Sequence, residues 1–323
     1  MHKVRVGVLR GGPSSEHQIS LKTGETAIRN IPEDYYEIHD IFISPDGQWH
    51  RHGLPVTPTH AISNVDVIFN ALHGHYGEDG KIQHILETHG IPFTGSGSFA
   101  SAVGMNKVMA KNVLKKEKIK TPQYRVIEDK KGLDKEKIIS LFRAFPLPLV
   151  VKPVSAGSSI GVALVKDFES FEKAIDTAFK YSGTVLVEEY IPGIEATVAV
   201  IDKYRDQDIY VLPAVEIRPK EKTFFDYDAK YGGMSEKIVP ANFSFSVKAE
   251  LESIASEVHQ ALGLRHYSRT DFIISPTRGI YVLEVNTLPG LTEESSLPKA
   301  LEAVGSSLSH FFHHILQLAL ERK

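Results

Sequence analysis

The chain contains no cysteine among its 323 residues. This absence excludes disulfide bonds, thiolate nucleophiles and metal sites built on cysteine. No apolar run approaches the roughly 20 residues that a membrane-spanning helix needs. The first residues, MHKVRVGVLRGG, read as a strand and not as the apolar core of a signal peptide. We therefore expect a cytoplasmic protein with no membrane partner.

The overall charge gives little sign of a polyanionic partner. A formal net charge of −3 offers no general electrostatic reason to bind nucleic acid or a membrane surface. Hydrophobic residues make up 42% of the chain and charged residues 24%, as in ordinary soluble globular proteins. The length is sufficient for two or three packed lobes.

The first part of the chain, residues 1–110, carries both strand and helix patterns. Strand-forming runs at KVRVGVLRGG, YEIHDIFIS and VDVIFNALHG accompany a helix from Ser15 to Asn30 and another at KIQHILETH. This alternation predicts a parallel α/β lobe. The next run, TGSGSFASAVGMNKVMAKNVLKKEKI, reads as a glycine-rich loop that leads into one long helix.

Beyond residue 121 the pattern changes. Apolar strand patterns follow one another closely, which predicts a more antiparallel region. One helix is expected after Ser246, a candidate N-cap, with Gly263 as its C′ residue, and an amphipathic helix ends the chain. Residues 218–242 are the most irregular stretch, and a loop of that length is uncommon unless it is functional or disordered.

Glu284 and Asn286 stand two residues apart in YVLEVNTLPGLT, a run that otherwise reads as a buried strand. Alternate residues of a strand share one face, and Asp271 lies on an earlier strand that can pair with this one. Two carboxylates and an amide oxygen form a cluster suited to Mg²⁺, whose other ligands are commonly water and substrate phosphates. The alternative is an exposed edge strand carrying polar residues. Arg269, on the same face as Asp271, argues against that alternative.

A phosphate-binding loop is the expected companion of such a metal site. VVKPVSAGSSIGV carries Lys152 at the end of a strand and continues into a Gly-Ser loop, whose small residues let backbone N–H groups approach phosphate oxygens. In VLVEEYIPGIEATV, Glu188 and Glu189 precede a turn and Glu195 opens the next strand, a layout that can read an adenine edge and hold ribose hydroxyls. Taken alone, the first segment is an ordinary turn with a surface lysine and the second is a hairpin.

In this order the motifs resemble the ATP-grasp fold, and the chain is similar to the D-alanine–D-alanine ligase family over essentially its full length. The matching motifs are GGPSSEHQIS, ALHGHYGEDG, TGSG followed by MNK, FDYDAKY and NTLPGLT. The resemblance implies an α/β (α+β) fold, in which an N-terminal parallel lobe (1–110) precedes a two-part ATP-grasp domain (111–317) with largely antiparallel sheets. That domain divides into a central (111–195) and a C-terminal (196–317) subdomain, and the loop 218–242 acts as a lid.

The family's functional residues map onto this chain position by position. ATP contacts are implied for Lys107, Lys152, Glu188, Glu189, Ile191, Glu195 and Lys230. Two Mg²⁺ ions, replaceable by Mn²⁺, are assigned to Asp271, Glu284 and Asn286. Catalytic roles fall on Glu16, Ser158, Tyr231, Arg269 and Gly290. Substrate binding is assigned to His73, Ser295 and Ser296.

Within this set, the resemblance implies that Glu16 binds the ammonium group of the first D-alanine and forms a hydrogen-bonded triad with Ser158 and Tyr231. Arg269 and the amide of Gly290 are expected to stabilise the oxyanion.

Two positions depart from the family pattern. Ser296 follows Ser295 where the family usually has leucine, which leaves the pocket for the second substrate's carboxylate open to question. Glu189 stands where lysine is frequent, a smaller departure because backbone atoms can still read adenine.

The implied reaction uses ATP to convert one D-alanine into an acyl phosphate, which the amine of a second D-alanine attacks, for peptidoglycan precursor synthesis in a homodimeric enzyme. A ligase with D-lactate or another D-amino acid as acceptor is the nearest alternative, and Tyr231 favours an amine. The three metal-binding side chains argue against a non-catalytic nucleotide-binding module. The absence of G-x-G-x-x-G argues against a nicotinamide-dependent oxidoreductase.

His310 and His314 lie four residues apart in the final helix and could form a metal-binding pair. No third ligand suggests itself, so we expect a solvated helical face instead.

Overall fold

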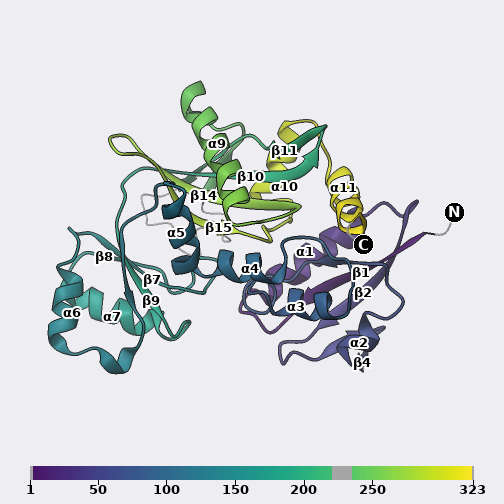
Figure 1. The fold of residues 1–323 in the computed structure, drawn as a ribbon, viewed down its shortest axis with the longest axis horizontal. Helices are drawn as coiled ribbons and strands as arrows, with labels where there is room; N and C mark the ends of the chain where they lie inside the picture. The colour runs from purple at the N-terminus through teal and green to yellow at the C-terminus, as the bar shows by residue number, and fades with distance from the viewer. Residues whose placement is uncertain (1–2, 220–234, 322–323) are drawn as a thin grey trace.

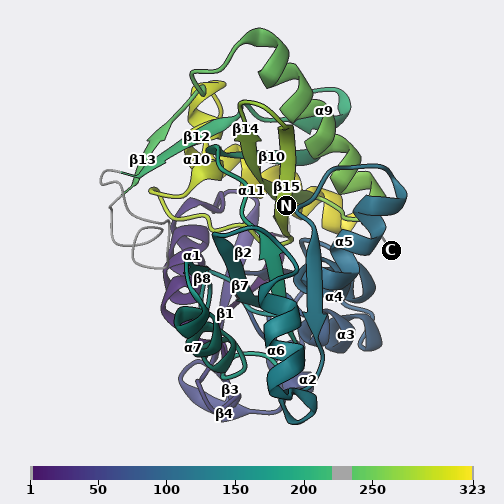
Figure 2. The same ribbon diagram turned by 90° about the vertical axis from the view of Figure 1, so that its left-hand side faces the viewer.

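A computed structural model describes residues 3–219 and 235–321, and these residues form three β-sheets (Figures 1 and 2). The first sheet has the strand order β4-β3-β2-β1-β5, with bounds Leu54–Val56, Trp49–Arg51, Tyr36–Ile43, Val4–Gly11 and Val67–Asn70. Strand β1 runs parallel to β2 and β5, so the predicted parallel lobe is confirmed at its centre. Strands β3 and β4 add an antiparallel edge. They are joined by His52 and Gly53, both at positive φ, as in a two-residue hairpin turn.

Helices cover both faces of this first sheet, and one of them comes from the far end of the chain. Helices α1 and α11 pack on one face and α2 and α3 on the other, with bounds His17–Asn30, Leu308–Leu320, Pro58–Ala61 and Lys81–Thr88. Phe69 of β5 meets Phe312 of α11 edge to face, with ring centroids 5.2 Å apart. The C-terminal helix therefore completes the core of the N-terminal lobe (Figure 1).

The second sheet is antiparallel, with the order β6-β9-β7-β8 and bounds Tyr124–Ile127, Val185–Glu189, Leu149–Pro153 and Ala163–Val165. Helices α6 (Lys135–Phe142) and α7 (Phe168–Ala178) pack on this sheet. A 3₁₀ turn, Lys130–Gly132, precedes α6 in the chain. Side chains alternate between the two faces of a strand. Val151 and Val187 thus reach the core beneath these helices, while Lys152 and Glu188 project from the opposite face.

The third sheet is also antiparallel, and β10 runs through its centre. Its order is β13-β12-β10-β14-β15 with β11 beside β10, and the bounds in chain order from β10 are Ile194–Tyr204, Gln207–Val211, Val215–Pro219, Ser235–Ile238, Tyr267–Ser275 and Gly279–Asn286. Val198 and Val200 belong to the core beneath α9 (Phe245–Ala261). Ala199 and Ile201 face the core formed with α10 (Ser296–Ala303) and α11.

Three local predictions are wrong. The single long helix is two helices, α4 (Ser98–Met105) and α5 (Lys107–Lys116), because Asn106 is extended and its side chain caps the second helix. The N-cap of α9 is Ser244 and not Ser246. The stretch 218–242 is not irregular throughout, since its first residues end β12 and β13 pairs with β12.

Lys230 and Tyr231, and most of the expected lid, lie outside the described residues. None of the described helices is long and apolar enough to cross a membrane.

Candidate active site

Two neighbouring strands bring the predicted metal ligands together. Asp271 of β14 pairs directly with Glu284 of β15, and Arg269 pairs with Asn286 two residues further along. The Arg269 guanidinium donates to both oxygens of Asp271, from Nε at 2.8 Å and from Nη2 at 2.9 Å. Asn286 Nδ2 donates to Asp271 Oδ2 at 3.2 Å. The expected face shared by Arg269 and Asp271 is confirmed.

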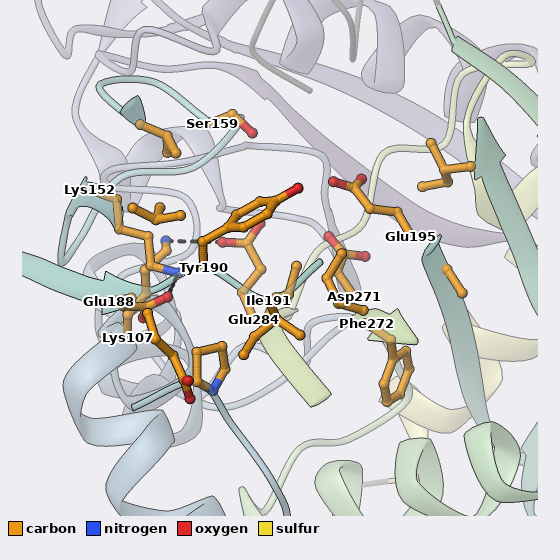
Figure 3. A pocket seen from close by; sticks show the side chains of 18 of the residues that line it. Lys107, Lys152, Ser159, Glu188, Tyr190, Ile191, Glu195, Asp271, Phe272 and Glu284 are labelled. Carbon is orange, nitrogen blue, oxygen red and sulfur yellow. Dashed lines mark ion pairs between the residues drawn. The ribbon is translucent and has the colours of Figure 1, made fainter. Parts of the chain in front are cut away.

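Strand β15 is the last strand of its sheet, yet the reading as an exposed polar edge is wrong. The side chains of Asp271 and Glu284 are only 13% and 21% exposed. Both line a pocket between the second and third sheets, where Figure 3 shows them next to each other. Partly buried carboxylates need counter-charges, and the pocket supplies them.

Lysines provide these counter-charges. Lys107, the first residue of α5, places Nζ 3.1 Å from Glu284 Oε2 and donates to the carbonyl of Ala156 at 2.8 Å. Lys152 places Nζ 2.7 Å from Glu188 Oε2. Figure 3 marks both ion pairs. Two ammonium groups in one pocket supply the kind of positive charge that binds phosphate.

Much of the remaining pocket lining is apolar and suits a planar base. Its apolar lining comes from Val150, Val162, Ile191, Ile217, Phe272 and Leu283. Glu195, on β10, lies across the pocket from Lys152 (Figure 3). Glu189 contributes to the lining, but its carboxylate is held by Arg278 at 2.9 Å and by the backbone N–H of Gln123 at 2.9 Å. The backbone N–H of Glu189 donates to the carbonyl of Gln123 at 3.0 Å, so its own carbonyl is the part left to read a base.

Glu16 occupies a second, buried part of the site. Ser158 donates a hydrogen bond from Oγ to Glu16 Oε1. Ser158 lies at φ +50°, in the Gly-Ser loop. A Cβ built on Gly74 or Gly157 would come within 2.6 Å of Glu16 Oε2, so only glycine lets these two loops close around the carboxylate.

His73 lies beside this region and is neutral at physiological pH. Its Nε2 is 2.8 Å from the hydroxyl of Thr23. Burial lowers the pKa of His73 to about 4. A neutral imidazole can donate a hydrogen bond to a bound amino acid or accept one from it. Because it carries no positive charge, it does not compete with the ammonium group of that amino acid for a carboxylate.

Gly290 and Ser295 face each other in the loop that follows β15. A Cβ on Gly290 would lie 3.1 Å from Ser295 Oγ. Ser295 Oγ is also 2.9 Å from Thr292 Oγ1. Ser296 is buried as the first residue of α10. The loop therefore presents a backbone amide and a hydroxyl side by side.

Two further residues of this region, Lys111 and Glu78, were not predicted from the sequence. Lys111 is buried against Glu188, and its signal was the four-residue helical spacing from Lys107. Glu78 accepts from the backbone N–H of Gly74 at 2.7 Å and of Leu288 at 3.2 Å. Its signal was a carboxylate in the glycine-flanked motif ALHGHYGEDG. Glu78 ties the loop of His73 to the loop that carries Gly290.

Replacing Glu78 with glutamine should change how stability depends on pH. Burial, together with the nearby Glu16 carboxylate, raises the pKa of Glu78 from 4.5 to about 8. Between these values the folded chain keeps a proton that the unfolded chain has lost, so wild-type stability falls as the pH rises toward 8. Glutamine cannot ionise. Denaturant unfolding should show the wild type losing about 2 kcal/mol relative to Glu78→Gln between pH 6 and pH 8. Parallel curves for the two proteins would contradict this assignment.

His310 and His314 of α11 do not form a metal pair. His310 is exposed, as expected for a solvated face, whereas His314 is half-buried and its Nε2 is 2.7 Å from the carbonyl of Asp202. In residues 3–219 and 235–321 no cluster of three or more His, Cys, Asp or Glu side chains could hold a metal ion.

The smaller set of Asp271, Glu284 and Asn286 fits Mg²⁺ in a different way. Asp271 and Glu284 line the pocket with Arg269 and Lys107 as their ion-pair partners, and Asn286 contacts Asp271 through its side-chain amide. Two carboxylates and an amide leave room for ligands from water and phosphate, which is how Mg²⁺ is usually held beside nucleotides.

Comparisons with known proteins agree with this geometry. A pocket held between two antiparallel sheets and lined by lysines and carboxylates is typical of the ATP-grasp fold, and the solved structures that resemble the chain share that fold. Family models described as "D-ala D-ala ligase C-terminus" and "D-ala D-ala ligase N-terminus" match residues 113–317, and 5–58 with 50–96. The chain belongs to the D-alanine–D-alanine ligase family. The fold class and family predicted from the sequence are confirmed.

Individual relatives match almost end to end. A D-alanine–D-alanine ligase from Geotalea uraniireducens is 39% identical over 98% of this chain and 95% of its own length. The Bacillus anthracis D-alanine–D-alanine ligase complexed with ATP is 32% identical, with a TM-score of 0.81 over 99% of this chain and 98% of that one. The VanG D-Ala:D-Ser ligase from Enterococcus faecalis is 28% identical, with a TM-score of 0.84 over 98% and 100%.

Proposed function

We propose that this chain joins two D-alanine molecules into D-alanyl-D-alanine at the expense of ATP, through an acyl phosphate, to supply peptidoglycan precursors. The observation that carries this function is the direct pairing of Asp271 with Glu284 in a pocket that also holds Lys107 and Lys152. A carboxylate is a poor acylating group, so phosphorylation must come first, and anionic reactants need this neutralising charge.

The nucleotide and metal roles follow from the pocket. Lys107 and Lys152 neutralise the phosphates, while the backbone of Glu189 and the side chain of Ile191 line the base site. Glu195 holds the ribose. Mg²⁺, held by Asp271, Glu284 and Asn286, would supply further positive charge beside the transferring phosphoryl group. Lys230 joins the phosphate contacts by family resemblance.

The amino-acid roles follow from the buried carboxylate. Glu16 binds the ammonium group of the first D-alanine, which Ser158 helps to position, and His73 borders the same subsite. Arg269 and the amide of Gly290 stabilise the oxyanion that forms when the second amine attacks. Closure of residues 218–242, with Tyr231 joining Glu16 and Ser158, would keep water from the acyl phosphate.

The domain boundaries, the cellular location and the oligomeric state are also inferred from the family resemblance. The domains run over 1–110, 111–195 and 196–317, in keeping with family matches that break between residues 96 and 113. The protein acts in the cytoplasm, where ATP and D-alanine meet, and forms a homodimer as the family resemblance implies.

Phosphate release from ATP tests the function directly. Release should depend on D-alanine and yield one D-alanyl-D-alanine per phosphate. D-Lactate added as an acceptor should not replace the second D-alanine. Phosphate release without dipeptide, or only with D-lactate, would point to a different acceptor, and no release at all would indicate a nucleotide-binding module.

Replacing Ser296 with leucine should alter only the acceptor subsite. Ser296 is buried beside Ser295, in the loop of Gly290, and lies far along the chain from Glu16. The substitution replaces a hydroxyl with an isopropyl group, and even a methylene-scale change in such a pocket is worth about 1–3 kcal/mol, or roughly 10- to 200-fold in discrimination. Initial rates fitted with two substrate constants should show the second D-alanine constant changing while the first stays nearly constant.

A panel of D-amino acids, D-serine included, completes this test, because one structural relative is a D-Ala:D-Ser ligase. A shift of the first constant instead would show that the two subsites are wrongly divided.

A further inference from the structure

Glu188 is a buried carboxylate with two lysines. Its side chain is 3% exposed. One oxygen, Oε2, is 2.7 Å from Lys152 Nζ, and the other, Oε1, is 3.0 Å from Lys111 Nζ. Burial by itself would raise the pKa of Glu188, but the charge of Lys111, followed by that of Lys152, outweighs it and holds the pKa below its ordinary value. Either lysine alone can balance the single charge of the carboxylate.

The two lysines differ in what else they contact. Lys111 is 2% exposed, and its ammonium group also donates to Thr121 Oγ1 and, at 3.5 Å, to the carbonyl of Pro122. The ring of Tyr124 lies 5.6 Å from the same nitrogen. The ammonium group of Lys111 therefore has a carboxylate, a hydroxyl and a carbonyl as neighbours, so Lys111 cannot leave without losing several contacts at once.

Lys152 is placed to move. It lines the nucleotide pocket, whereas Lys111 lies behind the pocket wall and does not. Glu188 is the one ion-pair partner of Lys152 within the described parts of the chain. A lysine has a long flexible stem, so its ammonium group can exchange a carboxylate for a phosphate by changing rotamers.

We propose that Lys111 is a positioning residue that stays as the counterion of Glu188 and thereby lets Lys152 leave this carboxylate for the phosphates of the nucleotide. The inference rests on the proposed ATP-dependent function. Without Lys111, Lys152 would be the only cation left on a buried carboxylate, and stranding that charge is strongly unfavourable. Phosphate binding would then have to compete with Glu188 for Lys152.

Binding of nucleotides with and without phosphates tests the proposal. The probes are AMP-PNP, a non-hydrolysable ATP analogue, and adenosine, each titrated against Lys111→Met and against Lys115→Met, an exposed lysine one turn further along α5. Lys111→Met should raise the Kd of AMP-PNP about tenfold or more and leave the Kd of adenosine nearly unchanged. Lys115→Met should change neither. Equal weakening of both probes by Lys111→Met would overturn the proposal, because Lys111 would then only support the adenine pocket.

A double variant keeps the proposal testable even if Lys111→Met alone destabilises the fold. If Lys111 acts through the charge of Glu188, it becomes dispensable once that charge is gone. Lys111→Met combined with Glu188→Gln should therefore bind AMP-PNP about as well as Glu188→Gln alone. A double variant that binds clearly more weakly would overturn the inference.

The wild type separates this inference from the proposed function. A wild-type protein that binds no AMP-PNP and releases no phosphate with D-alanine would refute the proposed function. A wild type that does both, with Lys111→Met equal to Lys115→Met, would refute only the role of Lys111.

Discussion

Glu284→Gln is expected to reduce D-alanine-dependent phosphate release by roughly 10²–10³-fold or more, while the protein remains folded. Glutamine keeps the shape of the side chain but removes its charge. The variant loses the carboxylate that stands directly opposite Asp271 and that pairs with Lys107 at 3.1 Å. Only one carboxylate would remain in the candidate metal set, so the metal would be held less tightly. The negative charge of the phosphoryl group would then be less well neutralised in the transition state.

The measurement is phosphate release at a series of Mg²⁺ concentrations, with thermal unfolding as the check on folding. Glu250→Gln, which changes an exposed glutamate of α9, provides the matched control and should behave like the wild type. Near-normal turnover of Glu284→Gln at limiting Mg²⁺ would show that Glu284 is not a metal ligand.

Arg269→Lys is expected to lower kcat by roughly 10²–10³-fold with a smaller effect on the KM for D-alanine. Lysine keeps the positive charge but cannot reproduce the two-pronged contact with Asp271, made at 2.8 and 2.9 Å. Thr197 also donates to Asp271 Oδ1, at 2.6 Å, so the carboxylate itself should stay in place. The substitution should therefore mainly weaken the stabilisation of the charge that develops in the transition state.

Arg143→Lys, at an exposed position that ends α6, serves as the control for this substitution. A large rise in KM with an unchanged kcat would mean that Arg269 binds the ground state of the substrate and does not act on the oxyanion.

Local periodicity was enough to predict that the strand of Asp271 pairs with the strand of Glu284, although not which residues stand opposite each other. The strand period of two and the short distance between the two strands along the chain leave few other arrangements. The helix boundary at Asn106 was not predicted. Asn106 is a preferred N-cap residue, and its two hydrogen bonds to the start of α5 explain why one helical pattern became two helices.

Contacts between distant parts of the chain could not be predicted in the same way. Lys111 meets Glu188 across 77 positions, and Glu78 meets the amide of Leu288 across 210. Neither partner carries a local pattern that identifies the other. The apolar stripe of α11 likewise predicted a buried face without indicating which sheet would bury it.

The destination of α11 affects the order in which the molecule can fold during synthesis. The strands of the first sheet are made before α11, but the face that contains Phe69 is covered by Phe312 of that later helix. The N-terminal lobe must therefore wait with an incomplete apolar face while more than two hundred further residues are added. Ribosomal stalling or early termination before α11 would leave that face exposed, so a truncated chain is a target for chaperones and proteases rather than a smaller working enzyme.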